Sequence, residues 1–367
     1  IMKQSERLMS LDALRGFDML FIMGFASLVV AVCGLWPSAV TDAAAASMSH
    51  VAWDGFAHHD TIFPLFLFIA GVSFPYSVAK QRAGGMSEGR IYAKIVRRGL
   101  TLVVLGMVYN GLFKLDFENL RIASVLGRIG LAWSIAAVLY LNFGVKTRAA
   151  IAVAVLAGYG ALSALVAAPD AAGAGPLTFE GNLAGYIDRQ FLPGKLIYGS
   201  FDPEGLLSTV PAVVTAMLGM FTGEFVRRGD IRGGRKTLWM AAAAAALLAA
   251  GLAFSGVLPV NKKLWSSTFV CVVGAYSLGM FALFYYLIDV RGWRRWTLFF
   301  RVVGLNSITI YLAQRIVGFG RISDFFLGGI ASKCPEAVAA VISSAGYVAV
   351  CWLFLYFLYR KNVFLKV

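Results

Sequence analysis

The sequence has little charge for its length. Charged residues make up 14% of its 367 residues, whereas a soluble protein carries about 25%. Hydrophobic residues make up 59%, and they occur in blocks of about 20 residues, long enough to cross a bilayer as helices. These features exclude a soluble globular fold. They predict an all-α, polytopic integral membrane helix bundle that uses residues 1–367 as a single transmembrane domain.

Cysteine is also scarce, which argues against classes of protein that depend on it. The four cysteines form no Cys-x-x-Cys pair, so neither a disulfide framework nor a zinc ribbon is indicated. The first residues lack a small-residue cleavage site after a short apolar core, so we expect a cytoplasmic N-terminus and no removed signal peptide. The net charge is +14, but no basic patch carries interleaved aromatics, and we expect no nucleic acid partner.

The apolar blocks predict about ten membrane spans. They lie at about 10–34, 61–80, 97–114, 121–143, 148–168, 205–226, 236–257, 265–288, 298–319 and 337–359. With the N-terminus inside, the inner segments hold more than twice as many Lys and Arg residues as the outer ones. The positive-inside rule therefore predicts that both termini are cytoplasmic and that the loop around His50 is outside.

The longest connection between predicted spans covers about residues 169–204, on the predicted outer side. A loop of this length is usually functional or disordered. It contains the aromatic residues Phe179, Tyr186, Phe191, Tyr198 and Phe201, which could pack as a lid and stack on a sugar. A plain structured loop is the equal alternative.

All three histidines lie in one segment, His50–Ser73, which runs into the second predicted span. His50 precedes Trp53 and Asp54. Histidine exchanges protons near neutral pH and can also act as a nucleophile. The alternative is an interfacial histidine that is hydrogen-bonded within a loop.

His58, His59 and Asp60 follow in the same segment. Their spacing from His50 fits no zinc pattern, so we expect no metal. We interpret Asp60 as a buried partner that orients a base, or as the N-cap of the next helix. His58 and His59 are interpreted as bystanders.

Charged residues inside predicted spans are functional candidates. Asp12, Arg15 and Asp18 follow one another at helical spacing in the first span, where Asp18 is expected to pair with Arg15. Arg121 and Arg128 are two turns apart on one predicted helix. Arg128 should line a polar cavity, where it could neutralise an anion or a developing oxyanion, or pair with an acidic residue such as Asp60 or Glu204.

Two further polar groups are candidates for binding. Asp202 and Glu204 open the sixth predicted span, where acidic residues suit a helix N-terminus but could also bind sugar hydroxyls or an amine. Asn306 and Ser307, in the inner half of the ninth predicted span, could bind a ligand or only a neighbouring helix.

At this point the chain resembles a family, the transmembrane N-acetyltransferases typified by heparan-α-glucosaminide N-acetyltransferase, and especially its bacterial relatives. The matching blocks, in family order, are SLDALRGFDM (10–19), HVAWDGFAHHDTIFPLFLFIAGVS (50–73), RIASVLGRIG (121–130), FDPEGLLSTVPAVVTAMLG (201–219), LWSSTFVCVVGAYS (264–277) and GLNSITIY (304–311). The resemblance implies acetyl transfer from cytosolic acetyl-CoA to the amine of a glucosamine-type sugar on the outer side of a bacterial inner membrane. The family's active-site histidine matches His50, and its buried aspartate before Phe-Pro matches Asp60.

Combining both readings assigns roles to the candidates. His50, Asp60 and Arg128 form the predicted catalytic group, with Arg128 as the oxyanion donor. The predicted substrate contacts are Trp53, Asp54, Asp202 and Glu204, and the predicted coenzyme contacts are Arg15, Asp18, Arg227, Arg228 and Asn306. The expected partners are an amino sugar, acetyl-CoA and the lipid bilayer, and a homodimer is allowed.

Two other functions remain as alternatives. A secondary transporter for a sugar or ion would use Asp18 and Arg128 as pathway charges. An O-acyltransferase of cell-surface polysaccharide would use a hydroxyl acceptor in place of an amine.

Overall fold

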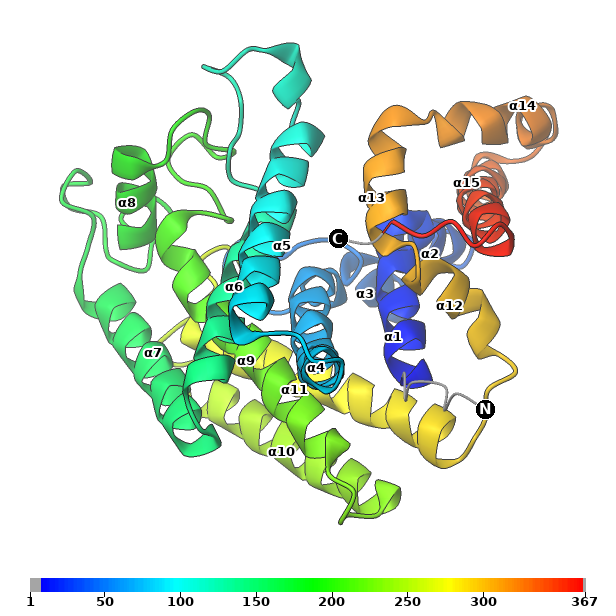
Figure 1. Ribbon diagram of the computed structural model, residues 1–367. Coiled ribbons are helices and arrows are strands. Elements are labelled where there is room, and N and C mark those ends of the chain that lie inside the picture. The colour runs from blue at the N-terminus through cyan, green and yellow to red at the C-terminus, as the bar shows by residue number, and fades with distance from the viewer. Residues whose placement is uncertain (1–7, 366–367) are drawn as a thin grey trace. The chain divides into compact units, whose positions relative to one another are not determined.

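The computed structural model describes residues 8–365, and helices dominate it (Figure 1). The chain is 71% helical and has no strand within the described residues, which confirms the all-α prediction. It divides into two compact units. The described residues of the first are 8–51, 57–62 and 280–365, and those of the second are 52–56 and 63–279. The single transmembrane domain over 1–367 stays a prediction.

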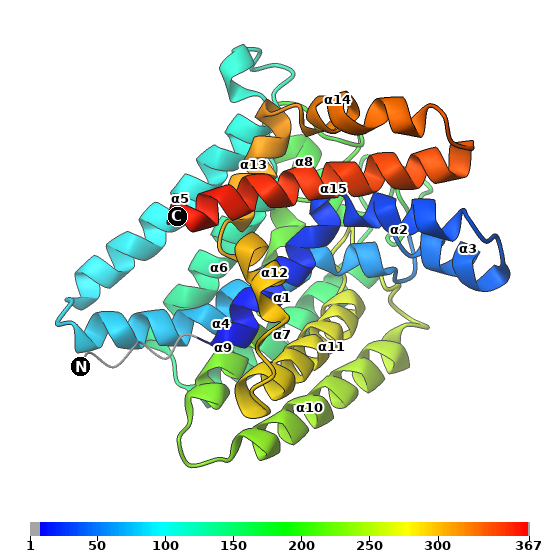
Figure 2. The same cartoon turned by 90° about the vertical axis from the view of Figure 1, so that its right-hand side faces the viewer.

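The first unit is built around a broken N-terminal helix and the C-terminal helices. Its elements are α1 (Met9–Leu20), η1 (Phe21–Phe25), α2 (Ala26–Cys33), α3 (Ala39–Ala46), η2 (His58–Asp60), η4 (Tyr285–Val290), α12 (Thr297–Gly304), α13 (Ser307–Ile316), α14 (Phe319–Ala331) and α15 (Glu336–Arg360). The long α15 packs against both α2 and α14 (Figure 2).

A π-helical turn, η1, interrupts the first predicted span. Gly24 within it has a φ of 106°, a conformation that glycine adopts without strain. A Cβ at this position would also approach the ring of Tyr347 to 2.8 Å. Gln314 donates a hydrogen bond to the Ile22 carbonyl at 3.3 Å and a second to the Tyr347 hydroxyl at 3.0 Å. The kink therefore has a defined partner on α13.

Close backbone contact holds α1 against α12. A Cβ added at Gly16 would lie 1.7 Å from the Phe300 carbonyl oxygen, and one added at Gly304 would lie 2.1 Å from that of Asp12. Small residues permit such close packing of membrane helices. The Asp289 carboxylate accepts the Ser10 backbone N–H at 3.3 Å and so satisfies a donor at the start of α1.

The second unit is a bundle centred on α9. Its helices are α4 (Ile62–Ala83), α5 (Glu88–Tyr109), η3 (Leu112–Lys114), α6 (Val125–Asn142), α7 (Val145–Leu165), α8 (Leu183–Phe191), α9 (Leu206–Arg227), α10 (Gly233–Phe254) and α11 (Ser267–Phe284). The unit includes α4 from Phe63 onward and α11 as far as Gly279. α9 contacts α6, α7, α8 and α10. Its central position follows from its small residues and its buried apolar residues.

Glycines set the spacing of α4 and α9. A Cβ at Gly219 would lie 2.0 Å from the Phe68 carbonyl oxygen, and one at Gly71 would lie 2.2 Å from that of Ala216. In the core of this unit the buried rings of Phe63 and Phe269 both contact the ring of Trp265.

Eight helices in the described part of the chain are long and apolar enough to cross a membrane. They correspond to eight of the ten predicted spans, so the chain is a multi-pass membrane protein. The predicted third span corresponds to α5, which begins well before the predicted start at 97. It is long enough to cross a membrane, but it carries more charged residues than the eight helices do. The count of ten and the sidedness of the termini stay predictions.

Two predicted helix boundaries are wrong. The ninth predicted span, 298–319, is two helices, because the backbone leaves the helical conformation at Asn306 (φ −124°, ψ 30°). The fourth begins at Val125, so Arg121 lies in the loop before it and not on a shared helical face with Arg128. Ser124 ends that loop as the N-cap of α6, accepting the Gly127 N–H at 3.0 Å.

The α4–α9 contact can be tested with one methyl group. We expect Gly219→Ala to lower the stability of the purified protein by about 1–3 kcal/mol, the cost of overpacking a tight contact. Gly158→Ala is the matched control, since it lies within α7 and has no atom within 4 Å of the added Cβ. Thermal unfolding in detergent measures both, and equal midpoints for the two variants would contradict the close packing.

Candidate functional site

His50 and Asp60 form a hydrogen-bonded pair in the first unit. The Nδ1 atom of His50 lies 2.8 Å from Oδ1 of Asp60. The Asp60 side chain is 2% exposed, whereas that of His50 is 51% exposed. The prediction that Asp60 is a buried partner of His50 therefore agrees with the geometry, and the imidazole remains accessible.

Two backbone N–H groups also hold the carboxylate of Asp60. Its Oδ2 atom accepts the N–H groups of Val51 and Ala57, each at 3.3 Å. These bonds fix the carboxylate that contacts Nδ1 of His50.

The local fold explains how the pair comes together. Ser38 caps α3 by accepting the Thr41 N–H at 3.2 Å. After α3 ends, the Ser47 carbonyl accepts the His59 N–H at 3.0 Å. This bond closes a loop that holds the turn η2 beside His50.

His58 and His59 do not point the same way as Asp60. Successive side chains of a three-residue-per-turn helix diverge by about 120°. His58 packs on the ring of Phe21, with centroids 4.3 Å apart, and His59 packs on the ring of His50 at 4.5 Å. Burial lowers the pKa of His58. Among the described residues no group of three or more His, Cys, Asp or Glu side chains is placed to hold a metal ion.

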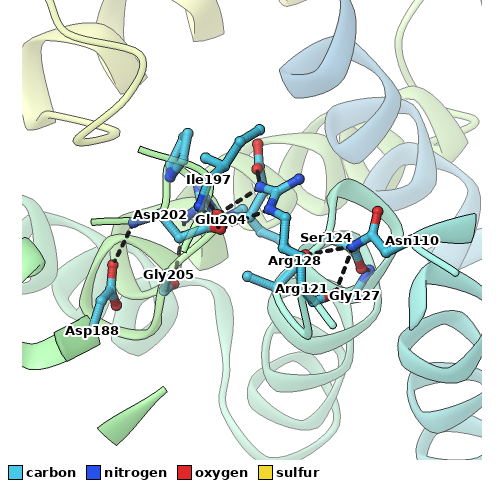
Figure 3. A network of polar contacts seen from close by, with 12 residues as sticks. Asn110, Arg121, Ser124, Gly127, Arg128, Asp188, Ile197, Asp202, Glu204 and Gly205 are labelled. Atoms are coloured by element: carbon cyan, nitrogen blue, oxygen red, sulfur yellow. Dashed lines mark hydrogen bonds and ion pairs between the residues drawn. The ribbon is translucent and has the colours of Figure 1, made fainter. Parts of the chain in front are cut away.

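The second unit contains a separate polar network at the start of α9 (Figure 3). Arg121 donates to both carboxylate oxygens of Asp202, through Nε at 2.7 Å and Nη2 at 2.6 Å, and also to Glu204. Burial alone would lower the pKa of Arg121, but the hydrogen bonds and negative charges of these two carboxylates outweigh it and raise the pKa. Arg121 is thus a fixed cation.

Asp202 is fully occupied by this network. It is 1% exposed, and besides Arg121 it accepts the backbone N–H groups of Ile197 and Glu204 at 3.3 and 2.9 Å. These bonds organise the turn before α9, and the role of Asp202 as a sugar contact stays a prediction. Glu204 is less enclosed, with its side chain 11% exposed.

Arg128 lies buried at the first turn of α6, 2% exposed. Its Nη2 atom donates to Ser208 and, at 3.4 Å, to the Gly205 carbonyl, and the guanidinium lies 5.0 Å from the centre of the Trp265 ring. Its Nε and Nη1 atoms have no hydrogen-bond partner within the described part of the chain. Arg128 therefore connects α6 to the start of α9, and its Nε and Nη1 donors are not used in that connection.

Asp188, on α8, is a buried carboxylate that the sequence analysis did not assign. Its two oxygens accept the backbone N–H groups of Leu206 at 2.9 Å and Asp202 at 3.2 Å, so it caps α9 from another helix. A Cβ at Gly205 would come within 2.0 Å of this carboxylate. Burial raises the pKa of Asp188 to about 6, against the lowering effect of the two backbone N–H groups. Its signal in the sequence was weak, because its partners lie 14 and 18 residues further along.

Trp53 and Asp54 belong to the second unit and are held by other residues of that unit. The Trp53 indole donates to the Leu177 carbonyl at 2.9 Å, and its ring contacts Phe179 and Phe201. Asp54 accepts the Val260 N–H at 2.8 Å. Phe179 and Phe201 also contact each other, so the connection 169–204 is a structured segment with its own aromatic core.

The predicted coenzyme contacts in the first unit are mostly held by protein partners. Arg15 pairs with Asp12 at 3.5 Å, and the expected pair of Arg15 with Asp18 is not found among the described residues. Asp18 is 2% exposed, and its Oδ2 atom has no hydrogen-bond partner in that part of the chain. Asn306 donates to the Val363 carbonyl at 3.2 Å, which fastens the end of the chain after α15.

The other two predicted coenzyme contacts lie at the end of α9 and are exposed. Arg227 lies over the Tyr76 ring, 5.7 Å from its centre. Arg228 pairs with Asp230, another exposed residue, at 2.5 Å. Exposed ion pairs contribute little to stability, so Arg228 can exchange Asp230 for another anion at small cost.

The titration of Asp188 gives a pH test with a defined sign. A carboxyl group whose folded pKa is raised stabilises the fold below its unfolded pKa of about 4, and this stabilisation is lost as pH rises through the folded pKa. We therefore expect the stability of the wild type, relative to Asp188→Asn, to fall by about 2 kcal/mol between pH 4 and 7. Thermal unfolding across this range measures it.

The matched control is Asp170→Asn, an exposed change in the same connection. Arg189 lowers the pKa of Asp170 through a side-chain hydrogen bond, so this variant should follow the wild-type pH curve between pH 5 and 7. A wild-type curve parallel to that of Asp188→Asn would contradict the assignment.

Comparison with known proteins identifies the family of the chain. A family model described as heparan-alpha-glucosaminide N-acetyltransferase, catalytic, matches residues 7–256. The heparan-alpha-glucosaminide N-acetyltransferase of Homo sapiens is 27% identical over 375 residues, which cover 87% of this chain and 55% of the human protein. That of Mus musculus is 26% identical over 372 residues, covering 87% and 56%. The chain spans about half the length of these curated relatives. Because the family model covers more than half of the chain, the chain belongs to the heparan-alpha-glucosaminide N-acetyltransferase family.

Proposed function

We propose that this protein is a membrane-embedded acetyltransferase that moves an acetyl group from cytosolic acetyl-CoA to the amine of a glucosamine-type sugar on the outer side. Family membership supports acetyl transfer as the reaction class. The single observation that carries the proposal is the His50–Asp60 pair, which combines a buried carboxylate with an accessible imidazole.

In direct transfer, Nε2 of His50 acts as a general base. It takes a proton from the sugar amine as the nitrogen attacks the thioester carbonyl, and the C–S bond then breaks. The imidazolium returns that proton to the departing sulfur, so coenzyme A leaves as a thiol. The bond from Nδ1 to Asp60 holds the required tautomer and stabilises the positive charge that develops on the ring.

In a two-step route, Nε2 itself attacks the thioester. The acetyl group passes to Nε2 as the C–S bond breaks, and coenzyme A leaves as a thiolate. The sugar amine then displaces the imidazole from the acetyl group, and the proton that the amine loses balances the thiolate, so coenzyme A ends as a thiol. Both routes need the same free lone pair on Nε2 and the same hydrogen bond to Asp60.

The remaining assignments follow from charge and exposure. Arg227 and Arg228 suit the phosphates of the coenzyme because both are exposed cations. We retain Arg15, Asp18 and Asn306 as proposed coenzyme contacts and Trp53, Asp54 and Glu204 as proposed sugar contacts. Asp202 acts through the network that fixes Glu204. Arg128 is retained as an oxyanion donor on account of its unused N–H groups.

The proposed topology rests on the distribution of Lys and Arg between the connections. The excess of Lys and Arg in alternate connections favours ten spans with both termini in the cytoplasm. The membrane would be the inner membrane of a bacterium, with the His50 segment facing outward. The donor thioester must then reach across much of the bilayer.

The roles of the pair predict two activity losses. We expect His50→Ala to reduce acetyl transfer to glucosamine by at least about 100-fold, the contribution of a positioned acid–base group. Asp60→Asn should cause a loss of at least similar size, because an amide can stabilise the wrong imidazole tautomer. Asp42→Asn, an exposed change on α3, is the matched control. Full activity of a folded His50→Ala protein would exclude the proposed function.

A trapping experiment separates the two routes. The protein is incubated with labelled acetyl-CoA without acceptor, quenched without acid and digested for mass spectrometry. The two-step route predicts label on the His50 peptide of the wild type and none in His50→Ala. An active wild type that carries no label follows direct transfer.

A further inference from the structure

Two segments of the first unit are interrupted rather than continuous helices. The first predicted span breaks within η1, where Gly24 has a φ of 106°. The chain after α12 breaks at Asn306, before α13, and again at Val317 and Gly318, whose non-helical backbone separates α13 from α14. Such breaks leave backbone N–H and C=O groups without their helical partners, so other polar groups have to supply them.

The helix α15 shows at which depth the first break lies. It has 25 residues, so it is about 37 Å long and can cross a hydrocarbon layer of about 30 Å. A Cβ at Gly24 would lie 2.8 Å from the ring of Tyr347 and 3.5 Å from the side chain of Val348. Both of these residues lie near the middle of α15. The break at Gly24 therefore lies near the middle of that span.

The second interrupted segment reaches the same depth. Gln314, in the last turn of α13, donates from Nε2 to the Tyr347 hydroxyl at 3.0 Å and to the Ile22 carbonyl of η1 at 3.3 Å. Phe319, the first residue of α14, also contacts the ring of Tyr347, with centroids 6.5 Å apart. From there α14 runs beside α15 (Figure 2). The two interrupted segments therefore meet at Gln314.

Gln314 has a second polar atom at this meeting point. Both of its hydrogen bonds use Nε2, and the side-chain oxygen Oε1 takes part in neither. The residue is partly exposed, whereas Ala313 before it is buried. An amide oxygen without a donor is costly away from water, and non-helical backbone inside a bilayer either is buried in protein or lines a polar space. Gln314 is therefore suited to accept an N–H group from a ligand in such a space.

We propose that Gln314 binds the pantetheine arm of acetyl-CoA, with its Oε1 atom accepting a hydrogen bond from an amide N–H of the arm. This inference rests on the proposed function, in which the coenzyme enters from the cytoplasm and its thioester reaches His50 on the outer side. An arm on that route passes the middle of the bilayer, the level at which Gln314 lies. The nucleotide end of the coenzyme stays on the inner side and does not reach Gln314.

Binding measurements with two ligands test this role. Gln314→Leu removes both polar atoms of the amide and should weaken binding of coenzyme A about 10-fold, the effect of one lost hydrogen bond. Adenosine 3′,5′-bisphosphate is the nucleotide end of the coenzyme without the pantetheine arm, and its affinity should stay within about 2-fold of the wild-type value. Calorimetric titration of the purified protein in detergent measures both ligands.

The matched control is the same substitution at an exposed glutamine of α8, Gln190→Leu, which should bind both ligands like the wild type. An unchanged affinity of Gln314→Leu for coenzyme A would overturn the proposal. Equal losses for the two ligands would also overturn it, because they would assign the effect to the fold and not to the arm.

A second measurement uses the wild type, so no substitution disturbs the helix breaks. Hydrogen–deuterium exchange with mass spectrometry reports how fast the backbone N–H groups of η1 and α13 exchange. Coenzyme A should slow the exchange of both elements several-fold, whereas adenosine 3′,5′-bisphosphate should leave it unchanged. If coenzyme A has no effect there, or if both ligands slow the exchange equally, the proposal fails.

The same titrations separate this inference from the proposed function. His50→Ala is titrated and assayed beside Gln314→Leu, and thermal unfolding confirms that each is folded. A wild type that binds no coenzyme A removes both the proposed function and this inference. An inactive His50→Ala protein that still binds coenzyme A, together with a Gln314→Leu protein of unchanged affinity, removes only the role of Gln314.

Discussion

A buried carboxylate must have hydrogen-bond donors, and this constraint at Asp60 organises the site of the first unit. Leaving such a group without donors would cost several kcal/mol. Two backbone N–H groups, from Val51 and Ala57, and the Nδ1 atom of His50 meet the requirement. The same bonds shape the loop and place His50. The fold of the loop and the proposed chemistry therefore share the same three contacts.

The second unit also contains buried charged groups that need partners, and it has more of them. Arg121 binds Asp202 and Glu204, while Asp188 accepts two N–H groups at the start of α9. Arg128, buried in α6, attaches to the same turn. Charges that converge on one helix start hold it firmly, since each would be costly to leave alone. A rigid helix start is a suitable base for Glu204, the less enclosed carboxylate of the group.

Helix packing in both units relies on small residues. Gly16 and Gly304 let α1 approach α12, and Gly71 and Gly219 do the same for α4 and α9. Membrane helices gain little from burying apolar side chains against one another, so close van der Waals packing carries more of the association. Side-chain hydrogen bonds hold the two helix breaks of the first unit. Gln314 donates to the Ile22 carbonyl beside the break at Gly24, and Asn306, at the second break, donates to the Val363 carbonyl.

The sequence alone determined the helical membrane class and the position of most spans. Both follow from apolar block length and the scarcity of charge, which are local properties. His50 and Asp60 were singled out from the other candidates only through their match to a family motif. The sequence did not reveal that Arg121 lies outside its helix, that Arg15 pairs with Asp12, or that Asp188 caps α9. The cap on α9 depends on distant groups, since residues 14 or 18 positions apart leave no periodic signal. The choice of Asp12 over Asp18 by Arg15, and the contact of His59 with His50, depend on side-chain directions that only the tertiary structure decides.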